Sequence, residues 1–146
     1  NKKNIYPITH KEMTRFFITL DQSVKFVLKS FERMIGGEIF IPKLPTIKIT
    51  DIVKTFHKNP KTKIIGIRPG EKIHELLSSK DESNNILSFK DHYVIVPILF
   101  GNLKDYLTNN IKEKGIKVSN NFEYISSNID SRLNLKQVKK ILDKKN

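Results

Sequence analysis

Residues 64–75 read Ile-Ile-Gly-Ile-Arg-Pro-Gly-Glu-Lys-Ile-His-Glu. The apolar start of this stretch favours a strand over residues 63–67, and the Arg-Pro-Gly-Glu sequence that follows is typical of a turn. Further apolar residues at helical spacing predict a short helix over residues 71–77. The turn therefore places a guanidinium and several carboxylates at a boundary between elements, where folds often present functional side chains. We take it as the first candidate for a ligand-binding site.

Patterns of strand and helix type alternate along the rest of the chain and indicate an α/β fold. The first expected helix has four apolar residues at helical spacing between positions 24 and 31, and Thr19 or Asp21 can cap its start. The expected elements are extended segments at 6–10, 14–20, 38–41, 89–97 and 122–125, a polar loop at 80–85, and helices that end at Gly36-Gly37, follow Thr50, cover 103–114 and begin after Asn134.

The composition is that of one folded domain. The 146 residues are 38% hydrophobic and include nine Phe, which is enough for a core. No run approaches about 20 apolar residues, so no transmembrane helix is expected, and no signal peptide is visible. The absence of cysteine excludes disulfides and thiolate chemistry and fits a cytoplasmic protein. Because the chain starts at Asn1 and a recognisable pattern is under way by Tyr6, we expect the N-terminal part of a longer protein to be missing.

The formal net charge of +12 raises the alternative of a basic nucleic-acid-binding module. The lysines are scattered, however, apart from a dense group at the C-terminus at positions 136, 139, 140, 144 and 145. Aromatic and basic residues do not interleave on any one expected face, as binding to single strands would require. We therefore interpret the charge as a solvated surface and expect no nucleic-acid partner.

The motifs of complete nucleotide or metal sites are absent. No Gly-x-Gly-x-x-Gly and no Gly-x-x-x-x-Gly-Lys-Ser/Thr occurs, and none of the four tyrosines has a lysine four residues downstream. No His-Glu-x-x-His occurs, and the four histidines are dispersed, so no metal site is expected. Cofactor-binding and catalytic residues of these kinds are therefore not expected in this chain.

Arg68 is the sharpest candidate, because it follows an expected strand at the end where open α/β sheets bind ligands. Its planar guanidinium matches a diphosphate, and the alternative is a structural ion pair with Glu71 or Glu75. Glu71 can accept hydrogen bonds from ribose or sugar hydroxyls, although acidic residues are also common in the first turn of a helix.

Arg15 lies in a run that is otherwise apolar or hydroxylic. A cation in such a place needs a partner, which is either an internal carboxylate such as Asp21 or an anionic ligand. Thr9 follows Pro7-Ile8 in an expected loop and can offer a hydroxyl to a ligand.

Three stretches, taken in order, resemble one family. Residues 7–22 read Pro-Ile-Thr-His-Lys-Glu-Met-Thr-Arg-Phe-Phe-Ile-Thr-Leu-Asp-Gln, and residues 36–51 read Gly-Gly-Glu-Ile-Phe-Ile-Pro-Lys-Leu-Pro-Thr-Ile-Lys-Ile-Thr-Asp. The third stretch is residues 64–75, quoted above. The family is that of the inverting UDP-N-acetylglucosamine 4,6-dehydratases, which are extended short-chain dehydrogenase/reductases of the polysaccharide-biosynthesis group. The segments 91–93 and 122–124 also fit. The resemblance covers nearly the whole chain, and Phe17 stands where relatives often have Trp.

The resemblance implies an NADP-dependent enzyme that acts on UDP-N-acetylglucosamine. Family members bind NADP in an N-terminal Rossmann domain and the UDP-sugar between that domain and a smaller C-terminal one. They make a 4-keto-6-deoxy sugar, with epimerisation at C5 in the inverting members, for surface-glycan or pseudaminic acid biosynthesis. By this resemblance Thr9, Arg68 and Glu71 contact the substrate, with Arg68 near the phosphates and Glu71 near the ribose, and Arg15 is a further candidate contact.

The resemblance also implies what the chain lacks. The NADP loop, the tyrosine–lysine pair and the acid of the elimination step all lie upstream in the family, so the chain alone is expected to be inactive. The expected fold is the C-terminal part of an extended short-chain dehydrogenase/reductase. Residues from about 16 to 41 would complete the missing Rossmann domain, and about 42–146 would form a small α/β substrate domain with a C-terminal extension. Apolar surface that the missing sheet covers would then be exposed. The full-length protein is expected to be a homo-oligomer, and the alternatives within the superfamily are a nucleotide-sugar epimerase or a retaining dehydratase.

Overall fold

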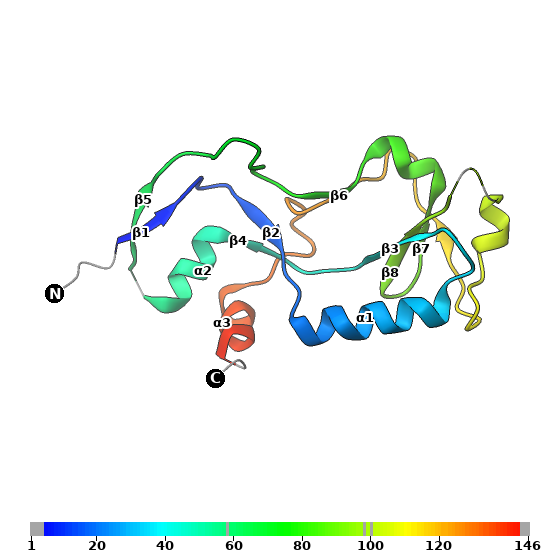
Figure 1. Cartoon of the computed structure of the whole chain (residues 1–146). Coiled ribbons are helices and arrows are strands. Elements are labelled where there is room, and N and C mark those ends of the chain that lie inside the picture. The colour runs from blue at the N-terminus through cyan, green and yellow to red at the C-terminus, as the bar shows by residue number, and fades with distance from the viewer. Residues whose placement is uncertain (1–4, 58, 98, 100, 144–146) are drawn as a thin grey trace. The chain divides into compact units, whose positions relative to one another are not determined.

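The computed structural model describes residues 5–57, 59–97, 99 and 101–143. The chain folds into two compact units, each built from segments that are distant in the sequence (Figure 1). The first unit contains residues 1–17, 44–75 and 125–146, and the second contains residues 18–43 and 76–124. Among the described residues, no helix is both long and apolar enough to cross a membrane.

The first unit combines two small strand pairs with two helices. Strands β1 (Ile5–Ile8) and β5 (Lys61–Ile64) are parallel, whereas β2 (Thr14–Phe16) and β4 (Thr46–Lys48) are antiparallel. Helix α2 (Ile49–Phe56) starts directly after β4 and packs against α3 (Leu135–Asp143), as Figure 1 shows. The buried apolar side chains of this unit are Ile8, Met13, Ile47, Val53 and Val138.

The second unit contains a four-stranded antiparallel sheet with the strand order β3-β8-β7-β9. Its strands are β3 (Ile39–Pro42), β8 (His92–Ile95), β7 (Ile86–Ser88) and β9 (Ile116–Lys117). Two 3-10 helices cover Lys80–Asn85 and Leu103–Tyr106, and β6 (Leu76–Ser78) pairs with β10 (Tyr124–Ile125). The core cluster consists of Leu87, Phe89, Val94, Val96 and Tyr106.

Helix α1 (Leu20–Arg33) opens the second unit with a capping box. The Thr19 hydroxyl accepts a hydrogen bond from the backbone N–H of Gln22, and the Gln22 side chain accepts one from the backbone N–H of Thr19. The helix keeps the expected apolar spacing, but that face is exposed within the described residues. Its exposed apolar side chains are Leu20, Val24, Val27, Leu28 and Phe31.

Four expected elements are wrong in their type or length. Residues 71–75 are irregular and lead into strand β6, because the backbone groups of Ile73 and Glu75 bond to Thr14 and Ser126 rather than within a helix. The expected helix over 103–114 is only a 3-10 turn at its start, and the expected polar loop at 80–85 is itself a 3-10 helix. The extended segment at 14–20 stops at Phe16 as a strand, since Thr19 caps α1.

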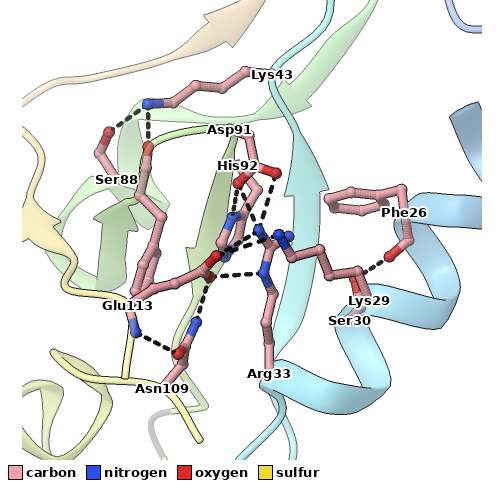
Figure 2. A network of polar contacts seen from close by, with 11 residues as sticks. Phe26, Lys29, Ser30, Arg33, Lys43, Ser88, Asp91, His92, Asn109 and Glu113 are labelled. Atoms are coloured by element: carbon pink, nitrogen blue, oxygen red, sulfur yellow. Dashed lines mark hydrogen bonds and ion pairs between the residues drawn. The ribbon is translucent and has the colours of Figure 1, made fainter. Parts of the chain in front are cut away.

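Arg33 ends α1 and is the centre of a network of polar contacts (Figure 2). Its side chain is 1% exposed and bonds two carboxylates: Nη2 donates to Asp91 Oδ1 at 2.8 Å, and Nε donates to Glu113 Oε2 at 2.8 Å. Asn109 exchanges two further hydrogen bonds with Glu113. The guanidinium thus joins α1 to the β7–β8 turn and to the segment before β9.

His92 also belongs to this network, and its side chain is fully buried (Figure 2). It stacks on Phe89 at a centroid distance of 4.6 Å, and its Nδ1 lies 2.8 Å from Asp91 Oδ1. Phe89 is confined in turn, because a Cβ atom at Gly115 would lie 2.7 Å from its ring.

Burial lowers the pKa of His92 below its ordinary value. The hydrogen bond from Arg33 lowers the pKa of Glu113 to about 2. For Asp91, burial opposes ionisation, but the hydrogen bonds from His92 and Arg33 prevail and lower its pKa to about 2.

Substituting Arg33 by Ala should reduce the free energy of unfolding by roughly 2–4 kcal/mol, because both carboxylates lose their partner and a buried side chain is removed. Chemical denaturation followed by circular dichroism measures the loss. Lys29→Ala is the matched control, since the Lys29 side chain is 47% exposed and its amine lies 3.5 Å from Glu113 Oε1. It should cost no more than about 1 kcal/mol. An equal loss in both variants would contradict the central role of Arg33.

Stability should fall as the pH is lowered from 7 to 2, in two stages. The pKa of His92 is lowered by folding, so the unfolded chain takes up the proton first and stability declines as the pH drops through about 6.5. The pKa values of Asp91 and Glu113, at about 2, lie below their unfolded values, so their contribution is lost between about pH 4 and pH 2. Urea denaturation across this range measures both stages. His92→Phe should abolish the first stage and reduce the Asp91 part of the second, because Asp91 also loses its hydrogen bond from His92. A first stage of unchanged size in His92→Phe would rule out the histidine.

Candidate ligand-binding site

Arg15 lies on β2 between two carboxylates of the first unit. Its Nη1 donates to the backbone oxygens of Thr14 at 2.7 Å and Ile73 at 3.2 Å. Its Nη2 lies 3.7 Å from Glu71 Oε1, and its Nε lies 3.3 Å from Glu75 Oε1. The side chain is 24% exposed, so the guanidinium is held in place but remains accessible.

The Arg-Pro-Gly-Glu sequence forms a tight turn that brings Glu71 to this position. The Glu71 N–H donates to the Arg68 carbonyl at 3.0 Å, and the Glu71 carboxylate accepts from the Arg68 N–H at 3.2 Å. Pro69 occupies the second turn position, and Gly70 occupies the third with φ +79°. These are the features of a type II turn, whose third residue favours glycine. The sequence therefore predicts the turn correctly, although the helix expected after it is absent.

The structure decides between the alternatives left open for the two arginines. Glu71 and Glu75 pair with Arg15, and no ion pair between Arg68 and either residue is found among the described residues, so the alternative of a structural ion pair at Arg68 is not supported. Internal carboxylates do hold Arg15, but they are not Asp21. The Arg68 guanidinium has no hydrogen-bond or ion-pair partner within the part of the chain that the structure describes, and residue 68 is exposed.

Thr9 follows β1 and is the outlying member of the predicted set. Its hydroxyl donates to the Met13 sulfur at 3.1 Å, and no described contact joins it to the other three residues. The structure thus brings together Arg15, Glu71 and the backbone of Arg68.

Four residues of this cluster have no role in the sequence prediction: Thr14, His74, Glu75 as a partner of Arg15, and Ser126. The Thr14 hydroxyl lies 2.8 Å from His74 Nδ1 and 2.8 Å from the Ser126 hydroxyl. Thr14 could be found from the sequence, because it is adjacent to the candidate residue Arg15 on a strand. Ser126 is 112 residues from Thr14, and local pattern cannot indicate such a contact.

The arrangement suits a polyanion that also carries hydroxyl groups. Arg68 and the exposed part of Arg15 offer donors to an anion, and the carboxylates of Glu71 and Glu75 can accept from hydroxyls. The described residues contain no group of three or more His, Cys, Asp or Glu side chains that could hold a metal ion. A pocket of about 520 Å³ elsewhere in this unit is lined by Ile8, Lys11, Lys48 and Thr62, among others, and by none of the four predicted residues.

The chain belongs to the family described as polysaccharide biosynthesis protein, whose model matches residues 1–97. It is 49% identical over 124 residues to the UDP-N-acetylglucosamine 4,6-dehydratase (inverting) of Campylobacter jejuni, which covers 84% of this chain and 37% of that protein. It is 34% identical over 139 residues to the UDP-glucose 4-epimerase of Rickettsia rickettsii, which covers 92% of this chain and 40% of that protein. The chain therefore spans about two fifths of the length of these relatives.

Among solved structures, the X-ray structure of Pen from Bacillus thuringiensis superposes with a TM-score of 0.78 at 23% identity. The match covers 99% of this chain and 42% of that chain, and at this identity it shows the fold alone. The resemblance to the inverting dehydratases is thus confirmed, as is the fold class, which is α/β and part of an extended short-chain dehydrogenase/reductase.

Hydrogen exchange should distinguish the two arginines. Arg15→Ala removes both backbone contacts and both ion pairs of the side chain, so amides of residues 71–75 should exchange about five- to tenfold faster. Arg68→Ala removes only an exposed side chain without a described partner, so exchange there should stay unchanged. Hydrogen-exchange mass spectrometry of the two variants measures this. Faster exchange in Arg68→Ala would mean that Arg68 holds the turn rather than facing a ligand.

Proposed function

We propose that the chain is the C-terminal, UDP-sugar-binding part of an NADP-dependent UDP-N-acetylglucosamine 4,6-dehydratase of the inverting type. The enzyme would make a 4-keto-6-deoxy nucleotide sugar for surface-glycan or pseudaminic acid biosynthesis. The observation that carries the proposal is the 49% identity to an inverting dehydratase. The exposed Arg68 guanidinium, which has no described partner, supports it, because the backbone of Arg68 contacts the Glu71 that pairs with Arg15.

In this proposal the two arginines bind the diphosphate of UDP-N-acetylglucosamine. Arg68 is exposed and without a described partner, so a phosphate can approach it without displacing a protein group. Arg15 is shared, and its 3.7 Å separation from Glu71 exceeds a normal hydrogen bond, which marks that contact as the weaker one. A phosphate that engages Arg15 would free Glu71 to accept hydrogen bonds from the ribose. Thr9 would contribute its hydroxyl at the edge of the ligand.

The family implies NADP, and the residues present do not fit that cofactor. A dinucleotide site needs a glycine-rich loop that opens a helix after a strand. The three described helices instead follow Thr19, Lys48 and Asn134. We therefore assign NADP, and with it the chemistry, to a part of the enzyme outside this chain, and we expect the chain alone to be inactive. The exposed apolar face of α1 supports the expectation that residues from about 16 to 41 complete the dinucleotide-binding domain.

A second candidate is a UDP-glucose 4-epimerase, which the 34% identity to the Rickettsia enzyme favours. The same contacts with a UDP group would serve both reactions, so analysis of the product decides between them. A dehydratase releases water and gives a 4-keto-6-deoxy sugar, whereas an epimerase returns a hexose. The stereochemistry at C5 separates an inverting from a retaining dehydratase. Oligomerisation and a cytoplasmic location stay predictions.

Arg68→Ala in the full-length enzyme should raise KM for UDP-N-acetylglucosamine by about ten- to a hundredfold, because a charge-assisted contact worth about 1.5–3 kcal/mol is lost. The affinity for NADP should be nearly unchanged. Steady-state kinetics and cofactor titration measure both quantities. Lys72→Ala is the matched control, because it removes an equal charge from an exposed position directly after the turn.

An unchanged KM in Arg68→Ala would overturn the phosphate role. An equal rise in KM in Arg68→Ala and Lys72→Ala would show that only the general positive charge matters, and not a specific contact of Arg68 with phosphate. The coding sequence upstream of Asn1 provides an independent check, since a glycine-rich nucleotide loop and a Tyr-x-x-x-Lys pair are expected there.

A further inference from the structure

The carboxylates of the candidate site lie on a segment that has no regular structure of its own. Residues 71–75 belong to neither a helix nor a strand. Their backbone is fixed from outside the segment: the Thr14 N–H donates to the Ile73 carbonyl at 3.0 Å. The Ser126 hydroxyl accepts the Glu75 N–H, and the Ser126 N–H donates to the Glu75 carbonyl, both at 2.8 Å. The positions of Glu71 and Glu75 therefore depend on Thr14 and Ser126.

A chain of side-chain hydrogen bonds connects the same residues. Ser126 Oγ lies 2.8 Å from Thr14 Oγ1, which lies 2.8 Å from His74 Nδ1. Ser126 Oγ also lies 3.2 Å from the Thr14 carbonyl. Thr14 and Ser126 are 1% and 0% exposed, so water cannot replace a missing partner and a lost hydroxyl would leave buried groups unsatisfied.

The chain of hydroxyls can carry its protons in either of two directions. In one, Ser126 donates to Thr14 and Thr14 donates to a bare His74 Nδ1. In the other, a protonated Nδ1 donates to Thr14, Thr14 donates to Ser126, and Ser126 donates to the Thr14 carbonyl. In both arrangements the Ser126 oxygen still accepts the Glu75 N–H. The clamp on Glu75 is therefore compatible with either tautomer of His74.

We propose that Ser126 and Thr14 are positioning residues for the ligand-binding carboxylates. Through the Glu75 backbone and His74 they hold the carboxylates of Glu71 and Glu75 beside Nη2 and Nε of Arg15. Glu71 can then accept hydrogen bonds from the ribose of a bound nucleoside diphosphate, while Arg15 faces its diphosphate. This rests on the proposed function of the same site. It adds a specific role for a residue near the C-terminus, distant in sequence from the Arg-Pro-Gly-Glu turn.

Isothermal titration of the full-length enzyme with UDP tests the inference. Thr14→Val preserves the shape of the side chain but removes its hydroxyl, and it should weaken UDP binding by about five- to tenfold. Thr14→Ser keeps the hydroxyl and should stay within about twofold. Ser126→Ala should match Thr14→Val. Ser127→Ala is the control, because only the backbone carbonyl of Ser127 has a described contact, with Arg132.

A double-mutant cycle separates positioning from general stability. If Ser126 acts through the carboxylates, Ser126→Ala should add little to the loss already caused by Glu71→Gln, whereas independent effects would add. If Ser126→Ala fails to fold by circular dichroism, the Thr14→Val and Thr14→Ser pair is used in the cycle instead.

The outcomes are distinct. UDP binding that Thr14→Val and Ser126→Ala leave unchanged overturns the inference alone, as does full additivity with Glu71→Gln. Absence of UDP binding to the unsubstituted full-length enzyme overturns the proposed function, and the inference with it. Weaker UDP binding in Thr14→Val, together with near-normal UDP binding in Thr14→Ser, supports both the proposed function and the inference.

Discussion

The buried guanidinium of Arg33 holds the second unit together. The sheet of this unit is narrow, and α1 turns its apolar face outward, so apolar contact alone does little to fix the helix. Arg33 supplies hydrogen bonds that tie the end of α1 to the β7–β8 turn and to Glu113. One nitrogen, Nη1, has no partner among the described residues, which makes the network less stabilising than its bond lengths suggest. Its main effect is to specify one arrangement of three segments.

The first unit contains a second arginine between two carboxylates, with different geometry. Arg33 is 1% exposed and sits 2.8 Å from each carboxylate, whereas Arg15 is 24% exposed and lies 3.3 and 3.7 Å from its partners. Short, buried pairs cannot exchange partners without a large desolvation cost, and longer, accessible pairs can. The same combination of charges therefore fastens the fold in one unit and stays available to a ligand in the other.

The sequence predicts the features that depend on local chemistry. The type II turn at Pro69-Gly70, the capping of α1 by Thr19 and the capping of α3 by Asn134 all follow from residue types a few positions apart. The features that it misses depend on contacts far apart in the chain. The irregular path of 71–75 results from bonds to Thr14 and Ser126, and the burial of Arg33 results from carboxylates 58 and 80 residues away. Arg15, Arg68 and Glu71 are candidates from both the local pattern and the resemblance, but neither indicates that Arg15 pairs with Glu71 and Glu75.

The contact between Gly115 and Phe89 has a consequence for how this protein can vary. A methyl group at position 115 would press on the Phe89 ring, which stacks on His92, which in turn bonds the carboxylate that holds Arg33. Residues 115, 89, 92, 91 and 33 therefore form a continuous series of contacts from the buried Gly115 to the end of α1. Substitutions along this line should be accepted only in compensating combinations, such as a larger residue at 115 with a smaller one at 89. The substitutions that position 115 can accept therefore depend on the Arg33–Asp91 salt bridge, which the glycine does not contact.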